Sequence, residues 1–186
     1  LYHGPTSAFK DIALTLLPHL LIQSYNKENR HDTISILTAT SGDTGKAALS
    51  GFADVKHTAI TVFYPEVGVS QVQKKQMQTA IGDNVEVIAV KGNFDDCQRM
   101  VKEATQDPQV LASLHNVTIS SANSINVGRL IPQVVYYYSS YCKLVRDGAI
   151  QCGDPVNFVV PTGNFGDILA GYLAYRTGLP VNQLIC

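Results

Sequence analysis

The sequence has no excess of charge of either sign, with Lys+Arg 14 against Asp+Glu 15 in 186 residues. A surface without a net field does not gather nucleic acid or anionic lipid, so neither is expected as a partner. The sequence also has no apolar run near the roughly 20 residues that span a bilayer, and no secretory signal pattern. These absences favour a cytoplasmic protein that acts on a small molecule.

Patterns for binding metal are also missing. The four cysteines are scattered without a C-x-x-C pair, and the five histidines form no i, i+4 pair. No zinc site or thiol redox centre is therefore expected, and no metal of any kind. Scattered cysteines fit a reducing cytosol.

What the sequence does contain is a steady alternation of short β-rich runs with longer helical patterns. Such alternation predicts an α/β fold, with an open and mainly parallel twisted sheet. The expected strands are 33–40, 58–64, 85–90, 117–121 and 156–160, and another strand starts at 181–185. The expected helices are 7–28, one from 44, 70–81, 94–105, 125–145 and 164–176. Pro18 and Pro132 lie inside two of them, where a helix can kink or break. Both ends look cut, so the chain is expected to be a piece of something longer.

The first candidate binding loop is Thr40-Ser41-Gly42-Asp43-Thr44-Gly45, between an apolar strand and a helix. Small ligands bind at the carboxyl ends of parallel strands, and free amides at a helix start favour a carboxylate or phosphate. The alternative is a plain turn with Ser41 or Asp43 as the N-cap. A nucleotide P-loop is excluded, because Thr40 replaces its first glycine and Ala47 replaces its Ser or Thr.

The second candidate loop, Gly163-Asn164-Phe165-Gly166-Asp167, follows another apolar strand. Its glycines allow close approach of a ligand, and its amides can converge on a phosphate. The sequence has no G-x-G-x-x-G, so a dinucleotide is not indicated. The charge of Asp167 opposes a phosphate unless its side chain turns away or caps the helix. A plain turn is again the alternative, but two such loops in one sheet favour a ligand cleft.

Lys10 is the candidate nucleophile. Ser7 is a plausible N-cap, which would place Lys10 in the first turn of a helix, near its positive end. That position and burial beside Phe9 would lower the pKa of the lysine, as Schiff-base formation requires. The alternative is an ordinary solvated lysine.

A fourth segment, Asn123 to Arg129, also opens a helix. Asn123, Ser124 and Asn126 supply hydrogen bonds, and Arg129 offers a planar fork to a phosphate or carboxylate. Helix capping by Asn123 or Ser124 is the alternative.

Taken together and in this order, these segments resemble the bacterial and fungal type of threonine synthase. The stretch His3-Gly4-Pro5-Thr6 through Ala8-Phe9-Lys10-Asp11 resembles that family's cofactor-lysine motif, and residues 38–45 resemble its substrate loop. Asn123-Ser124-Ile125-Asn126 with Arg129, and then the loop at 163–167, complete the set. The resemblance spans nearly the whole chain.

The resemblance implies a fold and a cofactor. The fold would be the tryptophan synthase β-like pyridoxal-phosphate fold (fold type II), with helices on both faces of its sheets, and it would be incomplete here. Residues 32–147, approximately, would form a smaller α/β lobe, and 1–31 with 148–186 would be parts of a larger cofactor-binding lobe. The cofactor would be pyridoxal 5'-phosphate. The Ser or Thr that usually meets its pyridine nitrogen comes much later in such chains.

The resemblance also implies residue roles. Lys10 would hold the cofactor as a Schiff base and move protons. The phosphate of the cofactor would be held by Gly163, Asn164, Phe165, Gly166 and Asp167. The carboxylate of the substrate would be bound by Ser41, Gly42, Asp43 and Thr44. Asn126 and Arg129 would contact the phosphate of the substrate.

The implied reaction converts O-phosphohomoserine and water to threonine and phosphate. A related branch degrades phosphorylated amino alcohols or hydroxy-amino acids by elimination, and the motifs do not separate the two. A third alternative is a non-catalytic module that binds a phosphorylated metabolite. The partner would be a small phosphorylated amino acid, and the sequence leaves a monomer or a homodimer open.

Overall fold

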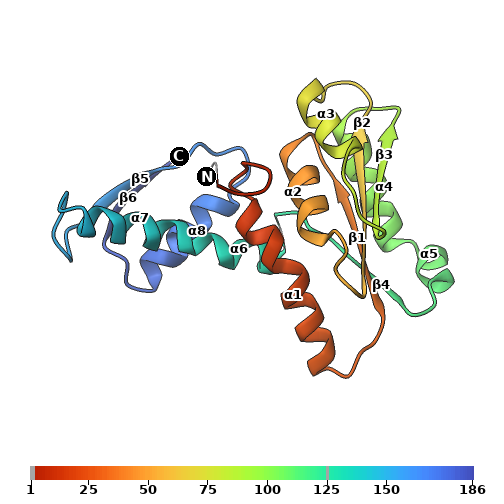
Figure 1. The fold of residues 1–186 in the computed structure, drawn as a ribbon, viewed down its shortest axis with the longest axis horizontal. Coiled ribbons are helices and arrows are strands. Elements are labelled where there is room, and N and C mark those ends of the chain that lie inside the picture. Colours follow the sequence, from red (N-terminus) through yellow and green to blue (C-terminus); the bar gives the residue numbers. More distant parts are fainter. Residues whose placement is uncertain (1–2, 125) are drawn as a thin grey trace. The chain divides into compact units, whose positions relative to one another are not determined.

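The computed structural model describes residues 3–124 and 126–186 (Figure 1). They divide into two compact units, the first ending at Asn123 and the second beginning at Ser124. The lobe boundaries expected from the sequence refer to a larger enzyme, and they stay a prediction. Within the described ranges, the helices are all too short or too polar to span a membrane.

The first unit contains a four-stranded parallel sheet in the order β3-β2-β1-β4. Its strands are β1 (Thr33–Ala39), β2 (Thr58–Pro65), β3 (Val85–Val90) and β4 (Val117–Ser120). Its helices are α1 (Asp11–Lys27), α2 (Asp43–Phe52), α3 (Gln71–Gln78), α4 (Phe94–Gln106) and α5 (Pro108–Ser113). All four expected strands are present, and their predicted bounds are right to within one residue.

Helices cover both faces of this sheet. Ile34 and Ile36 of β1 belong to a core shared with α1, α2 and α3, which lie on one side (Figure 1). Leu37 and Ala39 belong to a second core with Cys97 and Val101 of α4, on the other side. This alternation is the two-residue period of a strand buried on both faces. The predicted open α/β fold is confirmed.

The strand order places a topological switch between β1 and β4. The chain runs outward from β1 through β2 to β3, and then returns past β1 to form β4. In open parallel sheets, ligands bind at the carboxyl ends of the strands beside such a switch. The first candidate loop, which begins at Thr40, follows β1 at this place.

The second unit contains a two-stranded parallel sheet, β5 (Val156–Val159) with β6 (Val181–Ile185). Its helices are α6 (Val127–Leu130), the 3-10 turn η1 (Ile131–Gln133), α7 (Val134–Arg146) and α8 (Gly166–Arg176). The expected long helix is therefore broken at Pro132, as the missing amide of proline requires. Ile125, where that helix was expected to begin, lies outside the described residues.

Some expectations about the helices are wrong. Helix α1 begins at Asp11 rather than Ser7, because Ser7 has a φ of 57° and the Asp11 carboxylate accepts from the amide and hydroxyl of Thr6. Helix α1 also continues through Pro18 without a break. The sequence reading missed α5, although Asp107 as N-cap followed by Pro108 at the first helical position is a recognisable start signal.

Candidate functional site

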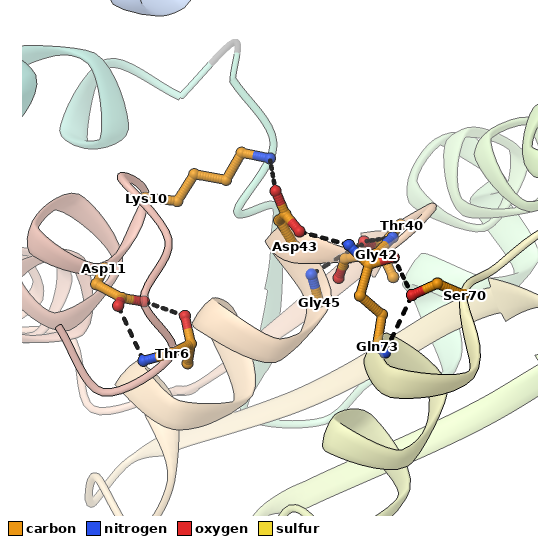
Figure 2. Close-up of polar contacts among 9 residues, drawn as sticks. All are labelled: Thr6, Lys10, Asp11, Thr40, Gly42, Asp43, Gly45, Ser70 and Gln73. Carbon is orange, nitrogen blue, oxygen red and sulfur yellow. Dashed lines mark hydrogen bonds and ion pairs between the residues drawn. The ribbon is translucent and has the colours of Figure 1, made fainter. Parts of the chain in front are cut away.

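Lys10 lies at the N-terminal end of α1, directly before its first helical residue. Its side chain is 19% exposed, and its Nζ lies 4.0 Å from Oδ2 of Asp43 on α2 (Figure 2). The same Nζ lies 5.4 Å from the centre of the Phe9 ring. The first unit thus brings Lys10 together with Asp43, a residue of the first candidate loop. The predicted Ser7 cap and first-turn position are wrong, but a largely buried lysine at the start of the helix is confirmed.

The N-cap residue of α2 is Gly42, not Ser41 or Asp43 as the plain-turn alternative expects, and the amides at this helix start are bonded by the side chain of Thr40. Thr40 is 2% exposed, and its Oγ1 accepts from the amides of Gly42 at 3.0 Å and Gly45 at 2.9 Å. Ser41 and Asp43 are exposed. The buried Thr40 hydroxyl takes these amides, so the side chains of Ser41 and Asp43 are not used as caps.

Asp43 is also held from α3. Nε2 of Gln73 donates to Oδ1 of Asp43 at 2.6 Å, and Oγ of Ser70 donates to Oε1 of Gln73 at 2.9 Å (Figure 2). Both oxygens of the Asp43 carboxylate are therefore directed at donors, one at Gln73 and one at Lys10. Gln73 is not recognisable from the sequence, because an ordinary glutamine on a polar helix gives no local signal.

The second candidate loop leads from β5 into α8, and Gly163, Asn164 and Phe165 are exposed. Among the described residues, no side chain caps the start of α8, and a Cβ placed on Gly163 would meet nothing within 4 Å. Open space beside uncapped amides at the start of an 11-residue helix is suited to an anion.

Asp167 is turned toward Tyr137 of α7. The Tyr137 hydroxyl donates to Oδ1 of Asp167 at 3.1 Å and to its carbonyl oxygen at 2.8 Å. Burial raises the pKa of the Asp167 carboxyl, and the hydrogen bond from Tyr137 opposes that rise. Burial also raises the pKa of Tyr137, so its hydroxyl stays a donor at neutral pH. The Asp167 carboxylate, whose charge would oppose a bound phosphate, therefore has a hydrogen-bond partner that the sequence does not indicate.

The fourth segment is arranged differently from the expected capping. Asn126 is the N-cap of α6, and its Oδ1 accepts from the Gly128 amide at 2.9 Å, so neither Asn123 nor Ser124 caps this helix. The backbone amide of Asn123 donates to Oγ of Ser121. Arg129 is only 5% exposed, and burial lowers the pKa of its guanidinium.

The candidate residues thus fall into two groups. Lys10 and 41–44 lie in the first unit, while Asn126, Arg129 and 163–167 lie in the second. Their individual roles stay predictions.

Comparison with known proteins identifies relatives. The family model described as "Pyridoxal-phosphate dependent enzyme" matches residues 1–186. A threonine synthase from Pseudomonas aeruginosa is 48% identical over 188 residues, which are 100% of this chain and 37% of that protein. Human threonine synthase-like 1 is 43% identical over 194 residues, which are 100% of this chain and 26% of that protein.

A solved structure of a threonine synthase is also similar to this chain. The crystal structure of pyridoxal-phosphate-bound threonine synthase from Brucella melitensis matches with a TM-score of 0.85 and 43% identity. The match covers 99% of this chain and 38% of that one. The chain therefore spans well under half the length of the relatives that it matches.

Proposed function

The chain belongs to the family of pyridoxal-phosphate-dependent enzymes, and on that premise we propose that the protein acts as a threonine synthase. The reaction converts O-phosphohomoserine and water to threonine and phosphate. The observation that carries the proposal is the placement of Lys10 against the loop that follows β1, beside the topological switch. The threonine synthase relatives, which cover the whole chain, support it.

The residues present fit the cofactor. Pyridoxal phosphate needs an amine that can attack its aldehyde, and donors for its phosphate. Lys10 supplies a largely shielded amine, and the uncapped start of α8 with the open Gly163 supplies amides for a dianion. The Asp167 carboxylate accepts a hydrogen bond from the Tyr137 hydroxyl, which reduces its repulsion of the phosphate.

The bound cofactor would supply an electron sink that stabilises a carbanion of the substrate. In our proposal Lys10 holds the cofactor covalently and moves protons, and the amides of residues 163–167 hold its phosphate. Residues 41–44 bind the carboxylate of the substrate, where the start of α2 favours an anion. Asn126 and Arg129 contact the phosphate of the substrate, to which a guanidinium can donate a bidentate pair.

We place this reaction in the cytoplasm, as a step of threonine biosynthesis. The support is that all four cysteines are free thiols, three of them exposed, and exposed thiols persist in a reducing compartment.

A second candidate function is elimination of phosphate from a phosphorylated amino alcohol or hydroxy-amino acid. The relatives named threonine synthase-like 1 favour it, because they match the whole chain almost as well as the threonine synthases do. Both reactions release phosphate, and they differ in whether threonine is formed.

The test is borohydride reduction of the full-length, cofactor-loaded protein, followed by mass spectrometry of the peptide that contains Lys10. We expect the cofactor to be fixed on Lys10. The adduct should be lost in Lys10→Ala and kept in Lys56→Ala, a matched change of an exposed lysine. An intact protein without an adduct at Lys10 would rule out the proposal.

Turnover then separates the candidate functions. Phosphate and threonine should appear together from O-phosphohomoserine. Phosphate without threonine would assign the elimination reaction. Binding of phosphohomoserine without any turnover, equally in wild type and Lys10→Ala, would show a non-catalytic binding module.

A further inference from the structure

We infer that Gln73 on α3 is a positioning residue for Lys10, and that it acts through the carboxylate of Asp43. The contacts run from Ser70 through Gln73 and Asp43 to Lys10, all within the first unit (Figure 2). The importance of Lys10 rests on the proposed function, but the contacts themselves do not.

The hydrogen bonds around Gln73 fix which way its amide points. Oε1 accepts from the Ser70 hydroxyl at 2.9 Å, so Nε2 is the atom that faces Asp43, at 2.6 Å. Ser70 is itself anchored, because its Oγ accepts from the backbone amide of Gln73 as the N-cap of α3. The side-chain amide of Gln73 is already held by Ser70, so it loses little further conformational freedom when Nε2 binds the Asp43 carboxylate.

The backbone of the loop is shaped to receive this side chain. A Cβ at Gly42 would lie 2.5 Å from Oε1 and 2.6 Å from Nε2 of Gln73. Only glycine lets the amide group approach the loop this closely. The end of Gln73 is therefore packed on the residue next to Asp43, and its hydrogen bond is not a chance contact of two long side chains.

Asp43 needs such a hold to stay near Lys10. Its side chain is 51% exposed, and an exposed ion pair at 4.0 Å does not by itself fix a carboxylate. The Gln73 donor occupies Oδ1 and leaves Oδ2 facing Nζ of Lys10. Without it, Asp43 can rotate toward water.

Two other charged groups of α1 and α3 contact other residues. Asp11, next to Lys10 on α1, accepts from Thr6, and Lys74 on α3 lies 6.0 Å from the centre of the Tyr64 ring. The carboxylate that faces Lys10 from α2 is thus Asp43. Its charge favours the ammonium form of Lys10 and holds the side chain in place whenever it is not bonded to the cofactor.

The test measures protonation of Lys10 in the full-length protein without cofactor. Acetic anhydride labels free amines, and mass spectrometry gives the extent of labelling at Lys10 across a range of pH. We expect the midpoint in Gln73→Met to fall by about half a pH unit to one unit, the size expected for losing one unit charge at this distance. Asp43→Asn should give the same fall, and the double variant should give no more.

Gln71→Ala, an exposed position on the same helix, is the matched control and should leave the midpoint unchanged. If Gln73→Met does not fold, Ser70→Ala tests the same contact from the other side. An unchanged midpoint in folded Gln73→Met would overturn the inference. A rise of the midpoint would overturn the inference as well, since it would show that Gln73 weakens the effect of the Asp43 charge on Lys10 rather than holding the carboxylate near it.

A second measurement uses the loaded enzyme. Gln73→Met should lower kcat more than it raises KM, because it releases the Asp43 side chain that holds Lys10 but leaves in place the helix start that favours the substrate carboxylate. The two proposals fail separately: without a cofactor adduct at Lys10 the proposed function fails, while the labelling midpoint still reports on Gln73. With the adduct present and the midpoint unmoved, only the role of Gln73 is lost.

Discussion

Two aspartates stand at the starts of helices that follow the candidate loops, Asp43 on α2 and Asp167 on α8. A carboxylate in a first helical turn is stabilised by the helix dipole, but it competes with any anion that uses the same amides. In each case a neutral donor from another helix takes the carboxylate, Gln73 for Asp43 and Tyr137 for Asp167. A side-chain donor thus binds the carboxylate in each case, so that an acidic residue can lie beside an anion-binding loop.

Tyr137→Phe tests this arrangement at the second loop. The phenylalanine keeps the ring contact with Phe158, at 4.9 Å between centres, but removes the donor to Asp167. The released carboxylate should repel the phosphate of the cofactor and weaken binding of pyridoxal phosphate several-fold. Binding of pyridoxal, which has no phosphate, should not change. Fluorescence titration of the full-length protein with both compounds measures the difference.

Two further variants make this prediction specific. Tyr137→Phe with Asp167→Asn should recover the affinity for pyridoxal phosphate, because the charge is gone. Tyr138→Phe should have no effect, since that hydroxyl contacts Thr177 at the far end of α8. Equal weakening of both compounds in Tyr137→Phe would mean that the tyrosine supports the loop only by packing.

At the scale of a single element, two buried threonines lie at the carboxyl end of β1, Thr38 within the strand and Thr40 directly after it. Thr40 is 2% exposed, and its hydroxyl accepts from the amides of Gly42 and Gly45. Thr38 is fully buried, and within the described part of the chain its hydroxyl has no hydrogen-bond partner. Thr40 ties the strand to the start of α2, whereas the Thr38 hydroxyl only costs desolvation.

The same substitution at these two positions should therefore have opposite effects. Thr40→Val leaves two buried amides without their acceptor and should lower the free energy of unfolding by about 1–3 kcal/mol. Thr38→Val should be neutral or stabilising by up to about 1 kcal/mol. Urea unfolding followed by circular dichroism gives both values. Similar losses at both sites would show that the Thr40 hydroxyl does not stabilise the start of α2.

At the scale of the whole molecule, the described residues form separate hydrophobic cores in the two units. The core around Leu14, Ile36 and Phe52 lies in the first unit, and the core around Tyr137 and Ala174 lies in the second. Local stability follows buried contacts, so damage to one core should not spread evenly through the chain.

Gly51→Ala tests this division. A Cβ at Gly51 would collide with the backbone oxygen of Leu14 where α2 meets α1, and backbone cannot move aside as a side chain can. The clash should exceed the gain of about 1 kcal/mol that alanine brings to a helix, for a net loss of a few kcal/mol. Hydrogen exchange by mass spectrometry should speed up in α1, α2 and the four-stranded sheet, while α7 and α8 stay unchanged.

Ser50→Ala, the neighbouring position on the same helix, is the control and should alter exchange in neither unit. A uniform increase throughout the chain in Gly51→Ala would show that the two units unfold as one.

The sequence by itself determined the order of the elements, the parallel sheet and the places of the candidate loops. These depend on local patterns: β-branched runs make strands, glycines mark the loops that follow them, and Pro132 breaks a helix. The resemblance of the loops to one family also lay in the sequence, because it is carried by short contiguous motifs. Lys10 was found in this way.

Tertiary structure alone decided which groups hold those loops. Gln73 lies 30 residues after Asp43, and Tyr137 lies 30 residues before Asp167, so neither pair leaves a periodic or local signal. The prediction of Ser41 or Asp43 as the N-cap of α2 is wrong for a related reason, since only the buried position of the Thr40 hydroxyl makes it the acceptor for the amides at this helix start. Hydrogen-bond partners are chosen by packing, and packing brings together residues that the sequence keeps apart.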